Sequence, residues 1–170
     1  MTSEAEALAL WRAYVPSWAH EPLSGSGAAA FGGRWNEPGQ PALYAALELS
    51  TAWAEYNQGF VQHPALIARL RLSGAKLIDL RDAPSLEKFG VDEAIHRTHW
   101  RAEMDEGRKP QTHILAARLR RAGFHGLFYP SFMSPGGTCV ALWRWNRKNG
   151  PKLEVVDPEG RMPSSRASWT

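Results

Sequence analysis

Three side chains with complementary chemistry lie close together in one stretch of the chain, residues 31–55. Arg34 follows a Gly-Gly pair and carries a planar guanidinium, which suits phosphate or carboxylate groups. Tyr44 adds an aromatic ring with a hydroxyl, and Glu55 adds a carboxylate. A cation, a phenol and a carboxylate are what a small globular protein needs to hold a phosphorylated ribosyl compound. We therefore predict that these three side chains form one binding site.

The local sequence predicts a loop, a strand and a helix that would position this site. The Gly-Gly pair lets the backbone before Arg34 approach a ligand closely. Residues 41–46 predict a short buried strand that carries Tyr44. Ser50 is the expected N-cap of a helix that begins at Thr51, because its hydroxyl can accept from the first free N–H groups. Glu55 would then lie in the second turn of that helix.

Each of these residues also has a plainer structural interpretation. Arg34 can pair with a surface acid, and Glu55 can be a solvent-facing helical glutamate. Two further residues are candidates for the same site. Ser131 follows a strand that stops at Pro130, where a side chain can face a cleft, and Arg12 either reaches a phosphate or is a surface arginine.

The rest of the chain predicts short strands mixed with helices. The expected strands are 65–72, 76–80, 124–129, 139–145 and 152–156, and the expected helices are 92–106 and 112–122. Residues 4–15 fit either a helix or a strand, and residues 20–30 and 81–91 predict loops. Because regular β-α-β alternation is missing, the fold class is α+β in a single domain. We place that domain in residues 1–156 and expect residues 157–170 to be a mobile or surface-lying C-terminal tail.

Composition narrows the class of protein. A length of 170 residues fits one domain, and a single cysteine, Cys139, excludes an intramolecular disulfide framework. The sequence has no apolar run suited to export or membrane insertion, so we expect a cytoplasmic protein without a membrane partner. The net charge of +3 comes from basic residues spread among acids, apart from a trio at 118, 120 and 121. This pattern argues against direct nucleic-acid binding.

Motifs for other chemistries are missing from the sequence. There is no phosphate-binding G-x-x-x-x-G-K run, no H-E-x-x-H pair and no Cys-x-x-Cys pair. His96 and His99 are close enough in sequence to share a metal, but no acidic or cysteine partner accompanies them. We therefore expect no metal. Ser131 lacks the G-x-S-x-G context of a serine hydrolase, and Cys139 lies in an apolar strand, where packing is its expected role.

The spacing of these residues resembles a known family. The matching motifs are Gly33-Arg34-Trp35-Asn36 continued by Gly39, Pro41 and Tyr44, then Ala52-x-x-Glu55, then Asp79-Leu80, and last Gly123-Phe124-x-Gly126-x-x-x-Pro130-Ser131. Over about residues 10–145 this arrangement resembles the RES domain, which is named for its arginine, glutamate and serine. The chain departs from the family at Thr138, where members often carry an asparagine, so an amide contact at that position is not expected.

The resemblance implies a function. RES-domain proteins are toxins of toxin-antitoxin pairs, with an ADP-ribosyltransferase-like fold and an Xre-like antitoxin that is expected to occlude the active site. They act on NAD, and the acceptor of ADP-ribose can be water, phosphate or a protein. The resemblance implies catalytic roles for Glu55, Arg34 and Tyr44 and NAD binding by Arg34, Tyr44 and Ser131. We add Arg12 as a further candidate for binding the phosphates of NAD.

A second interpretation belongs to a different class of protein. The same groove can serve as a docking surface in a non-catalytic partner that binds an Xre-like regulator and tunes transcription. Loss of NAD on expression of the chain without any partner separates the two.

Overall fold

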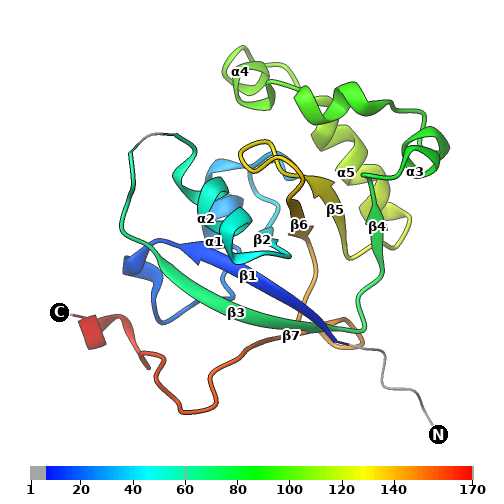
Figure 1. Ribbon diagram of the computed structural model, residues 1–170. Coiled ribbons are helices and arrows are strands. Elements are labelled where there is room, and N and C mark those ends of the chain that lie inside the picture. The colour runs from blue at the N-terminus through cyan, green and yellow to red at the C-terminus, as the bar shows by residue number, and fades with distance from the viewer. Residues whose placement is uncertain (1–6, 60, 170) are drawn as a thin grey trace, which may run out of the picture.

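A seven-stranded sheet forms the centre of the computed structural model, which describes residues 7–59 and 61–169 (Figure 1). The strands are β1 (Leu8–Tyr14), β2 (Leu43–Ala46), β3 (Leu66–Ser73), β4 (Leu77–Asp79), β5 (Gly126–Pro130), β6 (Thr138–Leu142) and β7 (Lys152–Val155). Their order across the sheet is β4-β5-β6-β2-β1-β3-β7. The β4–β5 pair is parallel and all the other pairs are antiparallel.

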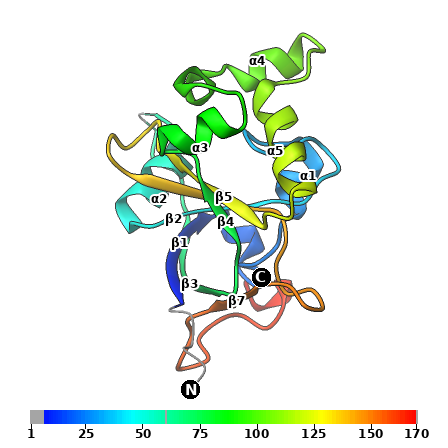
Figure 2. The same cartoon turned by 90° about the vertical axis from the view of Figure 1, so that its right-hand side faces the viewer.

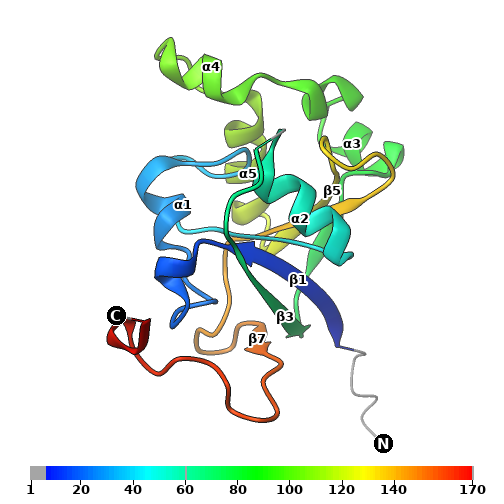
Figure 3. The same cartoon turned by 60° about the vertical axis from the view of Figure 1, so that its left-hand side comes forward.

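Short helices flank this sheet. They are α1 (Ser26–Phe31), α2 (Leu49–Asn57), α3 (Ala83–Lys88), α4 (Trp100–Asp105) and α5 (Gln111–Arg121), with 3₁₀ turns η1 (Pro16–Trp18), η2 (Glu93–Arg97) and η3 (Arg166–Trp169). The helix α2 packs on β1, whereas α3, α4 and α5 gather at the end of the molecule that carries β4 and β5 (Figures 2 and 3). Among the described residues, no helix is long and apolar enough to cross a membrane.

Two apolar cores lie on opposite faces of the sheet. Alternate residues of β6 show the division, because Cys139 and Ala141 join one core while Val140 and Leu142 join the other. The first core lies under α3 and α5 and includes Leu80, Leu115 and Leu127. The second core is formed largely by β1, β2, β3 and β7. Helix α2 packs against β1, β2 and β6.

Most of the predicted strands are confirmed, with small differences at their ends. Strand β3 alternates as expected, with Ala68, Leu70 and Leu72 buried and Arg69 and Arg71 exposed. The ambiguous segment 4–15 contains strand β1, which pairs with β3 along its whole length. The best predicted helix, 112–122, corresponds to α5.

Four predictions about local structure were wrong. Residues 20–30 and 81–91 are not simply loops, because they contain the short helices α1 and α3. The expected helix 92–106 is broken at Thr98, whose backbone is extended, so that η2 and α4 form instead. Helix α2 begins at Leu49 with Glu48 at the N-cap position, two residues earlier than the predicted start at Thr51 with a Ser50 cap.

The segment that follows β7 lies on the surface, at the end of the molecule remote from α4 (Figure 1). The Asp157 carboxylate accepts hydrogen bonds from the backbone N–H groups of Arg161 and Met162, which makes a local turn. Further along, η3 lies against η1. This part of the chain therefore lies along the surface, and the expected domain end at residue 156 stays a prediction.

Candidate active site

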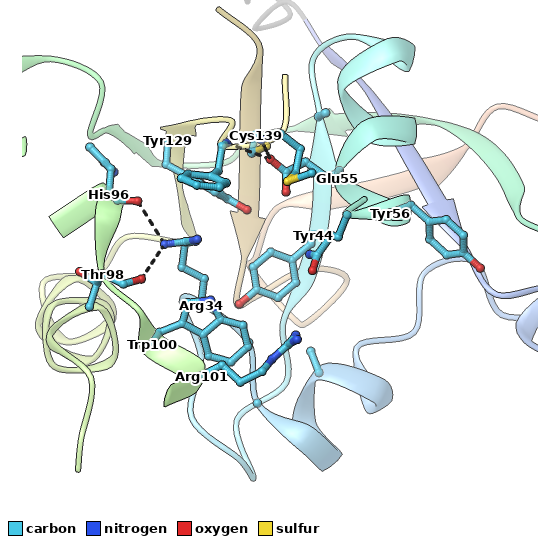
Figure 4. A pocket seen from close by; sticks show the side chains of 18 of the residues that line it. Arg34, Tyr44, Glu55, Tyr56, His96, Thr98, Trp100, Arg101, Tyr129 and Cys139 are labelled. Atoms are coloured by element: carbon cyan, nitrogen blue, oxygen red, sulfur yellow. Dashed lines mark hydrogen bonds between the residues drawn. The ribbon is translucent and has the colours of Figure 1, made fainter. Parts of the chain in front are cut away.

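A cavity of about 870 Å³ opens between α2 and the segment η2–α4. Its wall on the sheet side comes from β1, β2, β5 and β6, which contribute Trp11, Tyr44, Tyr129 and Cys139. This volume lies within the usual range for small-molecule and cofactor sites. Arg34, Tyr44 and Glu55 all line the cavity, as Figure 4 shows. The structure thus brings these three side chains together at one cavity, and their role in binding a ligand stays a prediction.

Arg34 enters the cavity from the loop that follows α1. Its Nη1 donates to the backbone carbonyl oxygens of His96 at 3.2 Å and Thr98 at 3.4 Å (Figure 4). No carboxylate of the described residues forms an ion pair with Arg34, so the surface-pair interpretation does not apply. Since a guanidinium has five N–H donors, the groups on Nε and Nη2 are left for an anion.

The phenol of Tyr44 is fixed by its own loop. Its hydroxyl donates to Asn36 Oδ1 at 2.7 Å and accepts from the Trp35 N–H at 2.9 Å. Burial raises the pKa of Tyr44 above its ordinary value, so the phenol stays protonated at neutral pH. A Cβ on Gly33 would lie 2.5 Å from the Tyr44 hydroxyl, so glycine is required here by close approach. Tyr44 therefore supplies a neutral aromatic wall.

Glu55 is held through one of its two oxygens. Its Oε1 accepts hydrogen bonds from Ser131 Oγ at 2.5 Å, from the Phe132 N–H at 3.1 Å and from the Met133 N–H at 3.3 Å. The loop makes no hydrogen bond to its Oε2, and the Cys139 side chain also interacts with this carboxylate. The loop after β5 thus fixes the carboxylate on the cavity wall and leaves one oxygen for a ligand.

Ser131 has a different place from the one the sequence suggests. Its side chain is 9% exposed, and its hydroxyl donates to Glu55 while accepting from the Ser134 N–H at 2.9 Å. The hydroxyl proton is therefore committed to the carboxylate. Ser131 contacts Glu55 and is not among the residues that line the cavity, whereas its expected contact with NAD stays a prediction.

Arg12 does not join the other candidates. It alternates with Trp11 and Ala13, which line the cavity, and so it points to the other side of β1. There its Nη1 donates to the Pro22 carbonyl oxygen at 2.5 Å, and burial lowers its pKa to about 10. The suggestion that Arg12 binds a phosphate of NAD is not supported, because β-strand alternation directs it away from the site.

Thr138, the residue that departs from the family pattern, also faces elsewhere. Its hydroxyl accepts from Arg81 Nη1 at 2.6 Å, and its N–H donates to Glu48 Oε2 at 3.2 Å. Arg81 in turn is paired with Asp79. These contacts join β4, β6 and the start of α2, and they give Thr138 a structural role beside the site.

Two histidines support the walls of the cavity, the buried His113 and the half-buried His96. His113 on α5 donates from Nε2 to the Gly33 carbonyl oxygen at 2.7 Å, and His96 donates from Nε2 to the Leu80 carbonyl oxygen at 2.9 Å. Because carbonyl oxygens only accept, each ring carries its proton on Nε2. Burial lowers the pKa of both histidines below their ordinary value. The neutral imidazoles thus tie Arg34's loop and its carbonyl partners to the core.

Several cavity residues were missed by sequence reasoning. Trp100 and Arg101 on α4 and Tyr129 on β5 line the cavity, as does Cys139, which was assigned to packing alone. Burial raises the pKa of the Cys139 thiol to about 12, so it is not a nucleophile at neutral pH. Asn36 stood inside a quoted motif and is fully buried, so its amide was a signal that could have been used.

No metal site is evident in the described residues. Residues 7–59 and 61–169 contain no group of three or more His, Cys, Asp or Glu side chains that could hold an ion. His96 uses Nε2 for a backbone contact, so it does not pair with His99 as a chelate through that atom.

The comparisons with known proteins address the family and the fold. No curated protein matches the chain by sequence. A chain in the crystal structure of the M. tuberculosis MbcT-MbcA toxin-antitoxin complex is similar, with a TM-score of 0.62 and 18% identity over 90% of this chain and 86% of that chain. This likeness shows that the two chains share a fold, and the mixed sheet with its flanking helices confirms the predicted α+β class. A family model, that of the RES domain, matches residues 9–165. With most of its length matched, the chain belongs to the RES domain family.

Proposed function

We propose that this protein is the toxin of a toxin-antitoxin pair and that it cleaves the bond between nicotinamide and ribose in NAD. The observation that carries the proposal is the pairing, in one cavity, of an anchored carboxylate, Glu55, with a guanidinium, Arg34, that has no carboxylate partner among the described residues. The family supports this chemistry, because RES-domain proteins act on NAD in general.

The chemistry needs a carboxylate more than it needs a general acid. When the bond between C1′ and the pyridinium nitrogen breaks, its electron pair stays on nitrogen, and nicotinamide leaves as a neutral molecule. The ribose is then left with oxocarbenium character, by analogy with glycoside hydrolysis. Glu55 Oε2 stabilises that positive charge and holds a ribose hydroxyl. The nucleophile adds to C1′ and loses its proton, which the carboxylate can accept.

The remaining side chains bind and orient the dinucleotide. Arg34 offers Nε and Nη2 to a pyrophosphate oxygen, while Nη1 stays on the carbonyl oxygens of His96 and Thr98. Tyr44 presents its ring to the nicotinamide or ribose, and Ser131 keeps Glu55 in place. Water, inorganic phosphate and a protein side chain are all competent acceptors, and mass spectrometry of the products distinguishes the three.

An antitoxin partner follows from the same proposal. The solved structure that resembles this chain is a toxin-antitoxin complex. Two large aromatic side chains at the cavity, Phe31 and Phe132, are 81% and 69% exposed. Exposed aromatics beside a cleft are typical of interaction surfaces. We propose that an Xre-like antitoxin covers this rim and occludes the cavity, and that both proteins act in the cytoplasm.

The test compares two glutamate variants of the full chain. Glu55→Gln keeps the shape of the side chain and removes the charge, so we expect NAD turnover to fall by about 100-fold or more. Glu87→Gln, on the exposed face of α3, should turn over NAD like the wild type. Circular dichroism of both variants verifies the fold. Wild-type turnover by the Glu55→Gln variant would remove the carboxylate from the mechanism.

Expression without any partner tests the toxin assignment. The wild-type chain should lower cellular NAD and arrest growth, and Glu55→Gln should do neither. If the wild-type chain leaves NAD and growth unchanged while it still binds an Xre-like regulator, the non-catalytic interpretation holds instead.

A further inference from the structure

Besides Arg34, two arginines line the cavity, Arg97 and Arg101, and Arg101 lies at the end remote from Glu55. Arg101 belongs to α4 and is exposed. Among the described residues it forms no hydrogen bond and no ion pair, even with Asp105, which lies one turn further along and also lines the cavity. Its single recorded contact is with the ring of Trp100, whose centroid lies 5.1 Å from Arg101 Cζ. The guanidinium is therefore oriented by an aromatic face and has its N–H groups available.

The order of the side chains along the cavity matches the order of groups in a dinucleotide. In Figure 4, Glu55 and Arg101 lie at opposite ends, with Arg34 and Tyr44 between them. NAD places its reactive ribose at one end, its two phosphates in the middle and its adenosine at the other end. With Glu55 at the reactive ribose, Arg34 falls near the first phosphate and Arg101 falls beyond it.

The charges of the ligand and of the cavity also place Arg101 near the second phosphate of NAD. The pyrophosphate of NAD carries two negative charges, and Arg34 already uses Nη1 on two backbone carbonyl oxygens. A second guanidinium would complete the neutralisation and add a planar fork for phosphate oxygens. Trp100, which holds Arg101, lies 6.4 Å from the His113 ring, and His113 binds the backbone of Gly33 beside Arg34. The two arginines are thus supported by one connected wall.

We infer that Arg101 binds the phosphate of the adenosine half of the dinucleotide and that Trp100 positions its guanidinium. This inference rests on the proposed cleavage of NAD, and it assigns Arg101 to substrate affinity while Glu55 serves the chemical step.

The experiment measures NAD turnover and, separately, binding of ADP-ribose by calorimetry. Arg101→Ala should raise KM for NAD and Kd for ADP-ribose by about tenfold, the scale of one charge-assisted hydrogen bond, with kcat within about twofold of wild type. Arg101→Glu should raise both constants further through repulsion, and Arg101→Lys should restore part of the affinity because it keeps the charge without the planar fork. Arg108→Ala is the matched control, because Arg108 is also an exposed arginine near α4 but does not line this cavity.

The outcomes separate this inference from the proposed function. If the wild type cleaves NAD while Arg101→Ala matches Arg108→Ala in both KM and Kd, the inference is overturned and the proposed function stands. A loss confined to kcat would also overturn it, since that would place Arg101 at the reacting atoms. If the wild type neither cleaves NAD nor binds ADP-ribose, both proposals fail.

Discussion

The position of the Glu55 carboxylate is set by hydrogen bonds to one of its two oxygens. Glu55 Oε1 receives three donors, all from the loop that begins at Ser131. Two of them are backbone N–H groups, which any residue at those positions supplies. The Ser131 hydroxyl is the part of this arrangement that depends on side-chain identity, so a substitution there tests how far orientation of Glu55 matters.

Replacing Ser131 with alanine should lower kcat by about tenfold, because a hydrogen bond to a charged group contributes about 1.5–3 kcal/mol. KM for NAD should change little, since the hydroxyl is turned to Glu55 and not to the cavity. Ser131→Thr keeps the hydroxyl and should recover most of the activity. Steady-state NAD turnover measures both constants.

A neighbouring serine gives the control for this prediction. Ser134 contacts the loop through its backbone N–H, which donates to Ser131 Oγ, and its own hydroxyl lies 3.4 Å from Thr51 Oγ1. Ser134→Ala should therefore turn over NAD within about twofold of wild type. Equal kcat values for the two alanine variants would contradict the role given to Ser131.

The site residues that could be brought together from the sequence are those that lie close to one another along the chain. Arg34, Tyr44 and Glu55 belong to one continuous loop-strand-helix unit, so local spacing sufficed to bring them together. The contact of the Ser131 hydroxyl depends on Glu55, which is far away in the sequence. The direction in which the Arg12 side chain points depends on its position in a β-strand. Arg12 could have been rejected only if 4–15 had been recognised as a strand, since alternation then sets its face.

The elements that were missed are those made by tertiary contacts. Helix α1 has six residues and none of them is buried, so no apolar periodicity marks it. The break at Thr98 is stabilised by Arg34, which donates to the carbonyl oxygens of His96 and Thr98 from a distant loop. Because this contact is far apart in the sequence, the local pattern of residues 92–106 does not reveal the break. Strands with alternating burial such as β3 were predicted well, because one face meets the core and the other meets solvent.

Helix α5 connects the core to the Arg34 loop through a histidine that should make stability depend on pH. Burial lowers the pKa of His113 in the folded protein below the ordinary value of about 6.5 in the unfolded chain. The unfolded chain therefore binds the proton first as pH falls. The stability that neutral His113 provides is complete above about pH 6.5 and is lost as pH falls toward the folded pKa.

The prediction is that the contribution of His113 to the free energy of unfolding is lost as pH falls below about 6.5. Urea unfolding at several pH values measures it. His113→Gln keeps a donor for the Gly33 carbonyl oxygen and should show a smaller loss over that interval than the wild type. His63→Gln, at an exposed position, controls for the substitution itself. The same slope in wild type and His113→Gln would contradict the linkage.

At the scale of the whole molecule, the site occupies one end and the C-terminal segment the other. The cavity is lined by residues between 11 and 139, whereas the chain after β7 runs over the opposite end of the fold (Figure 1). The RES family match extends to residue 165, nine residues beyond the end of the domain that we expect at 156. Residues 157–165 are thus part of the domain if its boundary follows the family match, and outside it if the domain ends at residue 156.

Two truncations distinguish these views. Removal of residues 157–170 takes away a mostly exposed segment in which η3 contacts η1, so NAD turnover should persist and Tm should fall by a few degrees. Removal from residue 152 onward also deletes β7, whose Leu153 is 1% exposed and lies in the core of β1 and β3. Loss of that side chain alone costs about 2–5 kcal/mol, and the ladder of β7 on β3 is lost with it.

Thermal unfolding followed by circular dichroism should therefore show a cooperative transition for the shorter deletion and a large loss of stability for the longer one. If both deletions unfold the protein, the domain extends through residue 165, and the tail is part of the fold rather than an appendage to it.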